Sequence, residues 1–200
     1  MTLGTVTAAQ AEQITIAALG DSLTQGYGLP VDEGLVPQLQ AWLVAEGEDV
    51  EVLNAGVSGD TTAGGLSRID WTLTPEVDAL IVALGGNDLL RGIDPEVSRA
   101  NLDGILQAAG DLPVLLVGME APGNYGPDYK AAFDAMYPEL AAEYDALLAD
   151  SFFEGLEAEA LDDAASLMQP DGIHPNAEGV ARIVAVLGPQ VQELIDRAEE

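Results

Sequence analysis

The only histidine of the chain, His174, lies three residues after an aspartate in the segment Asp171–Pro175. Across the intervening Gly172, a carboxylate at this spacing can accept a hydrogen bond from an imidazole N–H within a compact turn. Such a bond fixes the tautomer of the ring and stabilises the imidazolium that forms when the ring takes a proton. A lone histidine is more often structural than catalytic, but the Asp171 partner and the stiff Pro175 favour a general base here.

A base of this kind needs a nucleophile, and the sequence contains no cysteine. Ser22 is the best-placed hydroxyl, because it directly follows the first predicted strand in the segment Gly20–Leu23. A serine at a strand-to-helix turn is also a common helix N-cap, and this structural alternative stays open. The chain order Ser22, Asp171, His174 is consistent with a catalytic triad that only folding brings together.

Acyl transfer also requires hydrogen-bond donors that point at the developing oxyanion. Gly59 offers a backbone N–H with no side chain in the way, Asn87 offers a side-chain amide, and the N–H of Ser22 is the third donor. Taken singly, Gly59 is explained as a turn glycine and Asn87 as a turn-capping amide. Together with Ser22 and His174, they predict an acyl-transfer site.

Short apolar runs and longer helical segments alternate after Gln13 and must position these residues. The expected strands are Ile14–Leu19, Val50–Asn54, Ala79–Leu84, Val114–Val117 and, more weakly, Ala146–Ala149. The expected helices are Leu35–Glu46, Thr61–Leu73, Pro95–Ala109, Tyr129–Tyr144 and Asn176–Ala198. This alternation predicts a doubly wound α/β sandwich as one domain over residues 14–200. In such sheets the site lies beyond the carboxyl ends of the strands, where Ser22, Gly59 and Asn87 fall.

Composition excludes several classes of function. The chain of 200 residues has 35 acidic and 6 basic side chains, a net charge of −29, so nucleic acids and anionic membranes are excluded as partners. No segment approaches the roughly 20 apolar residues of a membrane-spanning helix. One histidine and no cysteine leave no basis for a multi-histidine or thiolate metal site, and neither metal nor organic cofactor is expected. The acidity favours a salt-adapted source over an acidic protein without that history.

The first thirteen residues form a separate segment, predicted to be a disordered tail or the remnant of a signal peptide. Met1–Ala11 carries no charge and ends in Ala9–Ala11, a small-x-small pattern typical of signal-peptide cleavage sites, with Glu12 as the mature start. We therefore expect a periplasmic or secreted protein, with a cytoplasmic location as the open alternative.

Four polar blocks resemble those of the SGNH hydrolases, also called the GDSL esterase/lipase family. They are Gly20–Leu23, Gly56–Gly59, Gly85–Asp88 and Asp171–Pro175. Two further segments, Asn54–Gly65 and Asn124–Tyr129, are similar to the bacterial arylesterase, thioesterase I and lysophospholipase branch, and the resemblance covers about residues 14–195. It implies a flavodoxin-like three-layer α/β/α sandwich with a five-stranded parallel sheet, and export to the periplasm.

The resemblance also implies Ser22 as nucleophile, His174 as base with Asp171 as its partner, and Ser22, Gly59 and Asn87 as the oxyanion hole. We expect a serine ester hydrolase acting on a small-molecule acyl ester, without stable membrane insertion. Carbohydrate deacetylation and a binding module that has lost turnover are the alternatives, and the oligomeric state stays open. The loops after the third and fourth strands are expected to form an apolar wall for the acyl group, unless their side chains are simply core. The wall residues are Leu89, Leu90, Met119 and Pro122.

Overall fold

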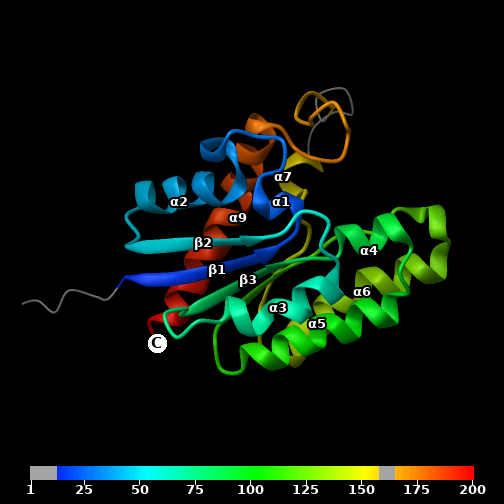
Figure 1. The fold of residues 1–200 in the computed structure, drawn as a ribbon, viewed down its shortest axis with the longest axis horizontal. Coiled ribbons are helices and arrows are strands. Elements are labelled where there is room, and N and C mark those ends of the chain that lie inside the picture. Colours follow the sequence, from blue (N-terminus) through cyan, green and yellow to red (C-terminus); the bar gives the residue numbers. More distant parts are fainter. Residues whose placement is uncertain (1–12, 158–164) are drawn as a thin grey trace, which may run out of the picture.

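A parallel sheet forms the centre of the computed structural model, which describes residues 13–157 and 165–200. In the described residues it has five strands in the order β2-β1-β3-β4-β5 (Figure 1). They are β1 Ile14–Gly20, β2 Val50–Gly56, β3 Ala79–Ala83, β4 Val114–Val117 and β5 Leu147–Ala149. The strand order reverses between β1 and β3, so the switch point of the fold lies at the carboxyl ends of these two strands.

The burial of the strands explains why their sequences are continuous apolar runs. Every residue of β3 and of β4 is buried, because helices cover both faces of the sheet. The edge strand β2 instead alternates, with Val50 and Val52 buried and Glu51 exposed.

Two helical layers cover the sheet (Figure 1). One contains α2 and α9, with α7 packed against α9, and the other contains α3, α5 and α6. The helices are α1 Ser22–Gln25, α2 Leu35–Glu46, α3 Thr62–Thr72, α4 Gly86–Arg91, α5 Pro95–Ala109, α6 Pro127–Glu143, α7 Glu154–Glu157 and α9 Ala177–Ala198, and the 3₁₀ turns are η1 Val31–Glu33 and η2 Gly123–Tyr125. This is the three-layer α/β/α sandwich that the sequence predicted. Within the described ranges, no helix is both long and apolar enough to span a bilayer.

The predicted element boundaries agree closely with the structure. The helices at Leu35–Glu46 and Pro95–Ala109 begin and end at the expected residues. Thr61 and Asn176, expected as the first residues of their helices, cap α3 and α9 through their side chains. The short helices α1 and α4 were not predicted, because four to six residues are too few to show a helical period.

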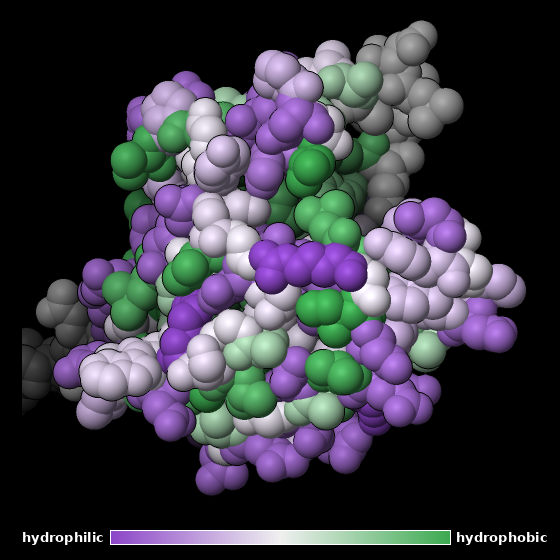
Figure 2. Space-filling model, turned by 45° about the vertical axis from the view of Figure 1, so that its right-hand side comes forward, coloured by the Kyte–Doolittle hydropathy of each residue, from purple (hydrophilic) through white to green (hydrophobic). Residues whose placement is uncertain are grey.

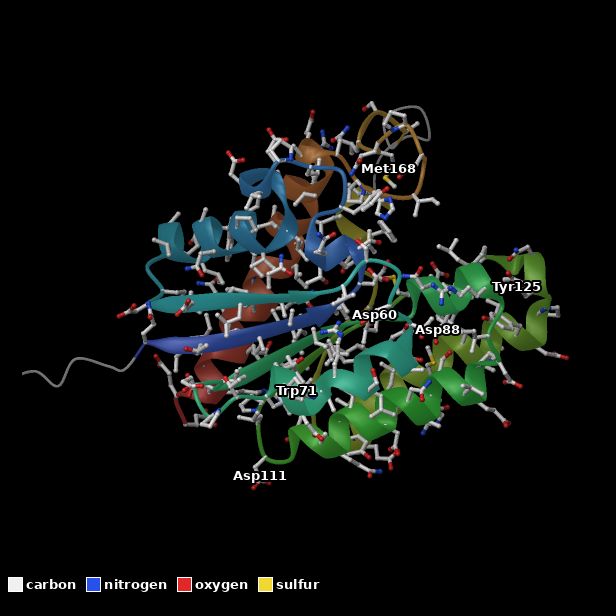
Figure 3. All side chains as sticks on the ribbon, viewed as in Figure 1. Asp60, Trp71, Asp88, Asp111, Tyr125 and Met168 are labelled. Atoms are coloured by element: carbon white, nitrogen blue, oxygen red, sulfur yellow. The ribbon has the colours of Figure 1, made fainter. Side chains whose placement is uncertain are left out.

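Different side chains lie near the two ends of the sheet. Asp60, Asp88 and Tyr125 lie toward the carboxyl ends of β1 and β3, whereas Trp71 and Asp111 lie toward the opposite end (Figure 3). The predicted tail, with Ala9–Ala11 and Glu12, falls outside the described residues except for Gln13, so that interpretation stays a prediction.

Candidate active site

Ser22 and His174 meet at the carboxyl end of β1, although they are 152 positions apart in the chain. Ser22 is the first residue of α1, and His174 lies in the loop before α9. The Oγ of Ser22 is 2.8 Å from Nε2 of His174, and Nδ1 of His174 is 2.7 Å from Oδ2 of Asp171. The folded chain therefore brings together, through two hydrogen bonds, the three residues that the sequence predicted as a triad.

The surroundings of Asp171 keep its carboxylate ionised. Its Oδ1 accepts hydrogen bonds from the backbone N–H groups of Ile173, at 2.9 Å, and of His174, at 3.0 Å. These bonds, that of Ile173 foremost, and the bond from the His174 ring lower the pKa of Asp171 from 3.8 to about 2. Gly172 has a φ of 68°, a left-handed conformation that lets the turn close. An ionised Asp171 holds a proton on Nδ1, which leaves Nε2 free to accept from Ser22.

The alternative role of Ser22 as a helix cap is wrong, because Asp21 is the N-cap of α1. The Oδ1 of Asp21 accepts from the N–H of Leu23 at 3.0 Å, and its Oδ2 accepts from Nδ2 of Asn87 at 3.0 Å. Asp21 is only 2% exposed, and this burial raises the pKa of its carboxyl group, although both hydrogen bonds act in the opposite direction. Sequence reasoning missed Asp21 as the partner of Asn87.

The three predicted oxyanion donors lie around one small hollow. Ser22, Gly59 and Asn87 line it together with His174, and its volume is about 190 Å³. Asn87 uses one amide N–H on Asp21, so the second remains available to a substrate oxygen. Gly59 has a φ of 84°, which a residue with a side chain rarely adopts.

Arg68 binds the loop that carries Gly59 to the ends of the neighbouring strands. Its Nε forms an ion pair with Asp60 at 2.7 Å, while Nη1 donates to the carbonyl of Ala55 at 2.7 Å and Nη2 donates to that of Gly20 at 2.9 Å. One side chain from α3 thus joins the ends of β1 and β2 to the residue after Gly59. A single arginine inside a helix gives no sequence signal for this role.

The short helix α4, which carries Asn87, is anchored by a fully buried carboxylate. Asp88 accepts from the N–H of Thr62 at 2.9 Å, from its hydroxyl at 2.6 Å and from the hydroxyl of Ser98 at 2.8 Å. These donors satisfy the buried oxygens of Asp88 and connect α4 to α3 and α5.

A glutamine that sequence reasoning missed connects the serine side of the site to the histidine side. Nε2 of Gln169 donates to the carbonyl of Tyr27 at 2.8 Å and to that of Pro175 at 3.0 Å. Its backbone N–H donates to the carbonyl of His174 at 2.7 Å. The Tyr27 ring lies against the imidazole, with ring centroids 4.8 Å apart.

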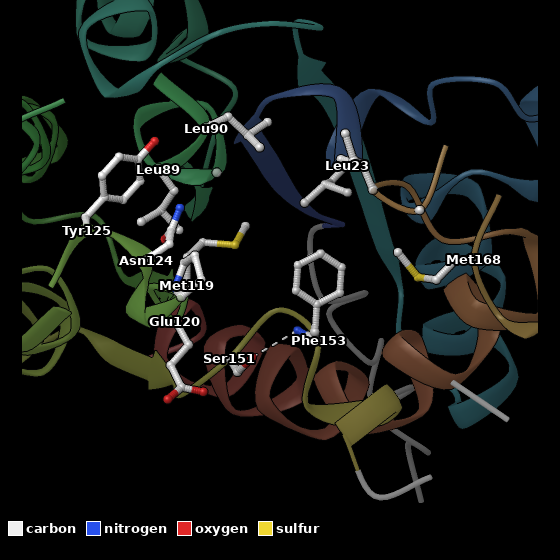
Figure 4. A pocket seen from close by; sticks show the side chains of 14 residues that line it. Leu23, Leu89, Leu90, Met119, Glu120, Asn124, Tyr125, Ser151, Phe153 and Met168 are labelled. Atoms are coloured by element: carbon white, nitrogen blue, oxygen red, sulfur yellow. Dashed lines mark hydrogen bonds between the residues drawn. The ribbon is translucent and has the colours of Figure 1, made fainter. Parts of the chain in front are cut away.

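A larger apolar cavity of about 610 Å³ adjoins the hollow, since Leu90 and Ile173 line both. All four residues predicted for the acyl wall, Leu89, Leu90, Met119 and Pro122, line this cavity. Leu23, Phe153 and Met168 also line it and were not predicted, because they come from three separate segments. Figure 4 shows Leu89, Leu90 and Met119 on one side and Leu23 and Phe153 facing them.

The face of the molecule that holds these cavities has hydrophobic and strongly hydrophilic side chains next to each other. Figure 2 shows this face, with the right-hand side of Figure 1 turned toward the reader. Hydrophobic side chains lie near its centre, beside strongly hydrophilic ones. Among the described residues, no group of three or more histidine, aspartate and glutamate side chains is arranged to hold a metal ion. The arrangement is suited to nucleophilic acyl transfer beside an apolar acyl site.

Comparisons with known proteins agree with this chemistry. Residues 18–182 match the GDSL-like lipase/acylhydrolase family. The chain is 40% identical to esterase TesA of Pseudomonas aeruginosa, over 93% of this chain and 92% of the relative. It is 36% identical to the thioesterase 1/protease 1/lysophospholipase L1 of Escherichia coli K12, over 91% and 85% of the two chains. The crystal structure of AlinE4, an SGNH-hydrolase family esterase, is 43% identical with a TM-score of 0.75, over 92% of this chain and 98% of that one.

Proposed function

Since this chain belongs to the GDSL-like lipase/acylhydrolase family and is a serine ester hydrolase, we propose that Ser22, His174 and Asp171 carry out its reaction. The observation that carries the assignment is the unbroken relay from Ser22 Oγ to His174 Nε2, at 2.8 Å, and from Nδ1 to Asp171, at 2.7 Å. The assignment is also supported by the hollow around Ser22, because Ser22, Gly59 and Asn87, the proposed donors to a tetrahedral intermediate, all line it.

In the acylation half of the proposed reaction, Ser22 Oγ attacks the carbonyl carbon of the ester while Nε2 of His174 takes the hydroxyl proton. The imidazolium that forms is stabilised by Asp171. The carbonyl oxygen becomes an oxyanion that accepts from the N–H of Ser22, the N–H of Gly59 and Nδ2 of Asn87.

Collapse of the intermediate breaks the bond to the alcohol or thiol, which leaves with the proton from His174. Water then enters, gives a proton to Nε2 and attacks the acyl group on Ser22. A second tetrahedral intermediate forms in the same hollow. Its collapse returns the proton to Ser22 Oγ and releases the carboxylic acid.

The preferred substrate in this proposal is an ester with an apolar acyl chain longer than acetyl. The adjoining cavity of about 610 Å³ is within the usual size of a small-molecule site and is lined mainly by aliphatic and aromatic side chains. An acetyl group would leave most of it unfilled, which disfavours the deacetylase alternative. Hydrolysis of p-nitrophenyl esters from acetyl to palmitoyl, beside an acetylated sugar, tests this. A maximum at acetyl, or turnover of the sugar alone, would contradict it.

The nucleophile is tested by Ser22→Ala, which removes only the hydroxyl. Ester turnover is expected to fall by several orders of magnitude while the circular dichroism spectrum stays the same. Ser58→Ala is the matched control, because Ser58 lines the same hollow but its hydroxyl donates to Gln25 at 2.7 Å. A serine-directed phosphonate should label Ser22 by mass spectrometry. Labelling of Ser58 or Ser151 would overturn the assignment.

We also propose that the enzyme is exported from the cytoplasm and that it tolerates salt. Export is supported by the segment Ala9–Ala11 and by the export that the family resemblance implies, and salt tolerance is supported by the net charge of −29. Fractionation of a bacterial host that expresses the whole chain tests export. Recovery in the cytosol alone would contradict it.

A further inference from the structure

The basic side chains of this acidic chain are almost all neutralised by carboxylates. The chain has 6 lysines and arginines, and all of them lie within the described residues. Five form ion pairs: Arg68 with Asp60, Arg99 with Glu139 and Glu143, Lys130 with Glu120 and Asp134, Arg182 with Glu178, and Arg197 with Glu193. The sixth, Arg91, forms none with any described carboxylate, although acidic side chains outnumber basic ones by 35 to 6.

This arginine lies beside the proposed catalytic hollow. Arg91 is the last residue of α4, the helix that also carries Asn87. Its Nη2 donates to the carbonyl of Gly59 at 2.8 Å, and its side chain is otherwise exposed. A guanidinium has five N–H donors in a planar fork, so a second, positively charged edge remains for a ligand.

The position of Arg91 indicates which part of the substrate it would meet. The acyl cavity is lined by Leu23, Phe153 and Met168 but not by Gly59. An acyl chain in that cavity places the alcohol or thiol over the hollow, where His174 must protonate it. Arg91 donates to the carbonyl of Gly59, which lines that hollow, so its guanidinium lies directly behind the lining residues.

We propose that Arg91 binds an anionic group, a carboxylate or a phosphate, on the alcohol or thiol part of the substrate. The inference rests on the proposed function and specifies the substrate further. Guanidinium groups recognise both anions through paired, charge-assisted hydrogen bonds. The net charge of −29 repels such a substrate at long range, so an unpaired cation at the hollow supplies the short-range attraction that the rest of the surface lacks.

A second explanation is that Arg91 only supports the Gly59 carbonyl. In that case its loss would slow every ester by the same factor. The experiment must therefore compare charged and neutral esters that share one acyl group. Suitable substrates are the butyryl esters of para-hydroxybenzoate, of para-hydroxyphenyl phosphate and of the neutral para-hydroxybenzamide.

The variants are Arg91→Gln, Arg91→Lys and, as the matched control, Arg99→Gln, which removes the same charge from the ion pairs with Glu139 and Glu143. At fixed physiological ionic strength, Arg91→Gln is expected to lower the ratio of kcat/KM for an anionic ester to that for the neutral ester by about fivefold. Arg91→Lys should lower it less, and Arg99→Gln should leave it unchanged. The anion that responds more, carboxylate or phosphate, identifies the ligand.

An equal change for all three esters would overturn the inference, as would an equal effect of Arg99→Gln. The proposed function is judged separately, by whether the unaltered enzyme hydrolyses the neutral ester at all. Calorimetric binding of the three intact esters to Ser22→Ala, with and without Arg91→Gln, gives a readout that needs no turnover. Weaker binding of the anionic esters alone in the double variant would support the inference.

Discussion

The pKa values of two aspartates at the site, Asp21 and Asp171, are shifted in opposite directions. Asp171 lies in an open turn and accepts three hydrogen bonds, which lower its pKa to about 2. Asp21 is buried beneath the hollow, and desolvation raises its pKa despite two hydrogen bonds. Asp171 is therefore a constant acceptor for His174 above about pH 4, whereas Asp21 is a carboxylate whose ionised form the fold disfavours.

The first prediction concerns how the stability of the wild type, relative to that of Asp21→Asn, changes with pH. Because the folded pKa of Asp21 lies above its unfolded value of 3.8, its contribution to stability is full below pH 3.8 and is lost as pH rises through the folded pKa. The substitution removes this dependence. Thermal unfolding from pH 3 to 7 is expected to show the wild type losing stability relative to the variant as pH rises. Parallel curves over this range would show that burial of Asp21 has no such effect.

A second prediction concerns Asn87, whose amide is already oriented by Asp21 at 3.0 Å. Loss of one oxyanion donor costs about 10²–10³ in turnover. Asn87→Ala is expected to lower kcat by that factor with little change in KM, because the donor acts on the transition state. Steady-state kinetics on a p-nitrophenyl ester provides the measurement, and an unchanged kcat would leave Asn87 with a structural role only.

At the scale of elements, the loops at the carboxyl edge hold together through side chains that cross between them. Gln169 connects the chain after α1 to the loop before α9, and Arg68 connects the ends of β1 and β2. The distance from Ser22 to His174 therefore depends on groups that take no part in the reaction.

Gln169→Leu tests this dependence, with Gln38→Leu as the matched control. Nε2 of Gln38 also donates to two backbone carbonyls, those of Glu33 and Ala177, at 2.7 and 3.0 Å. Each variant loses two hydrogen bonds, so both are expected to unfold about 1–3 kcal/mol more easily. Only Gln169→Leu should also slow the second-order reaction of Ser22 with a phosphonate, by about tenfold. Equal reaction rates in the two variants would mean that Gln169 contributes to stability alone.

Much of this arrangement could be predicted from the sequence, because the strands and helix starts have clear residue patterns. Buried strands such as β3 and β4 are continuous apolar runs, and caps such as Thr61 and Asn176 mark where helices begin. Three of the four polar blocks follow strand ends, so their convergence follows from the parallel sheet, and the fourth directly precedes α9. The roles of Gln169 and Arg68 could not be predicted, because their partners are backbone carbonyls from distant segments, which no residue type reveals.

The net charge of −29 determines how the stability of the whole fold depends on salt. Spread evenly over an accessible surface of 10303 Å², the 35 acidic side chains lie roughly 17 Å apart. This spacing exceeds the Debye length of about 8 Å at physiological ionic strength but not the length of about 30 Å at 0.01 M salt. The self-repulsion of the fold is therefore screened in salt and felt in dilute buffer.

The melting temperature is accordingly expected to rise between about 0.01 and 0.5 M NaCl. For a chain of this size, each 1 kcal/mol of screened repulsion raises Tm by about 2–4 °C. Differential scanning calorimetry at constant pH measures the shift, and sucrose at matched osmolality is the control for general exclusion effects. A Tm that does not change with NaCl would contradict a salt-dependent fold.

The hydrogen bond between Ser22 and His174 has a consequence for synthesis of the enzyme. Ser22, the proposed nucleophile, is made 152 residues before His174, its proposed base, which lies just ahead of the helix α9 that covers one face of the sheet. A chain still emerging from the ribosome thus has a serine without a base. We therefore expect hydrolytic activity to appear only once α9 has packed, so that recovery of activity after dilution from denaturant reports the completion of this fold rather than its onset.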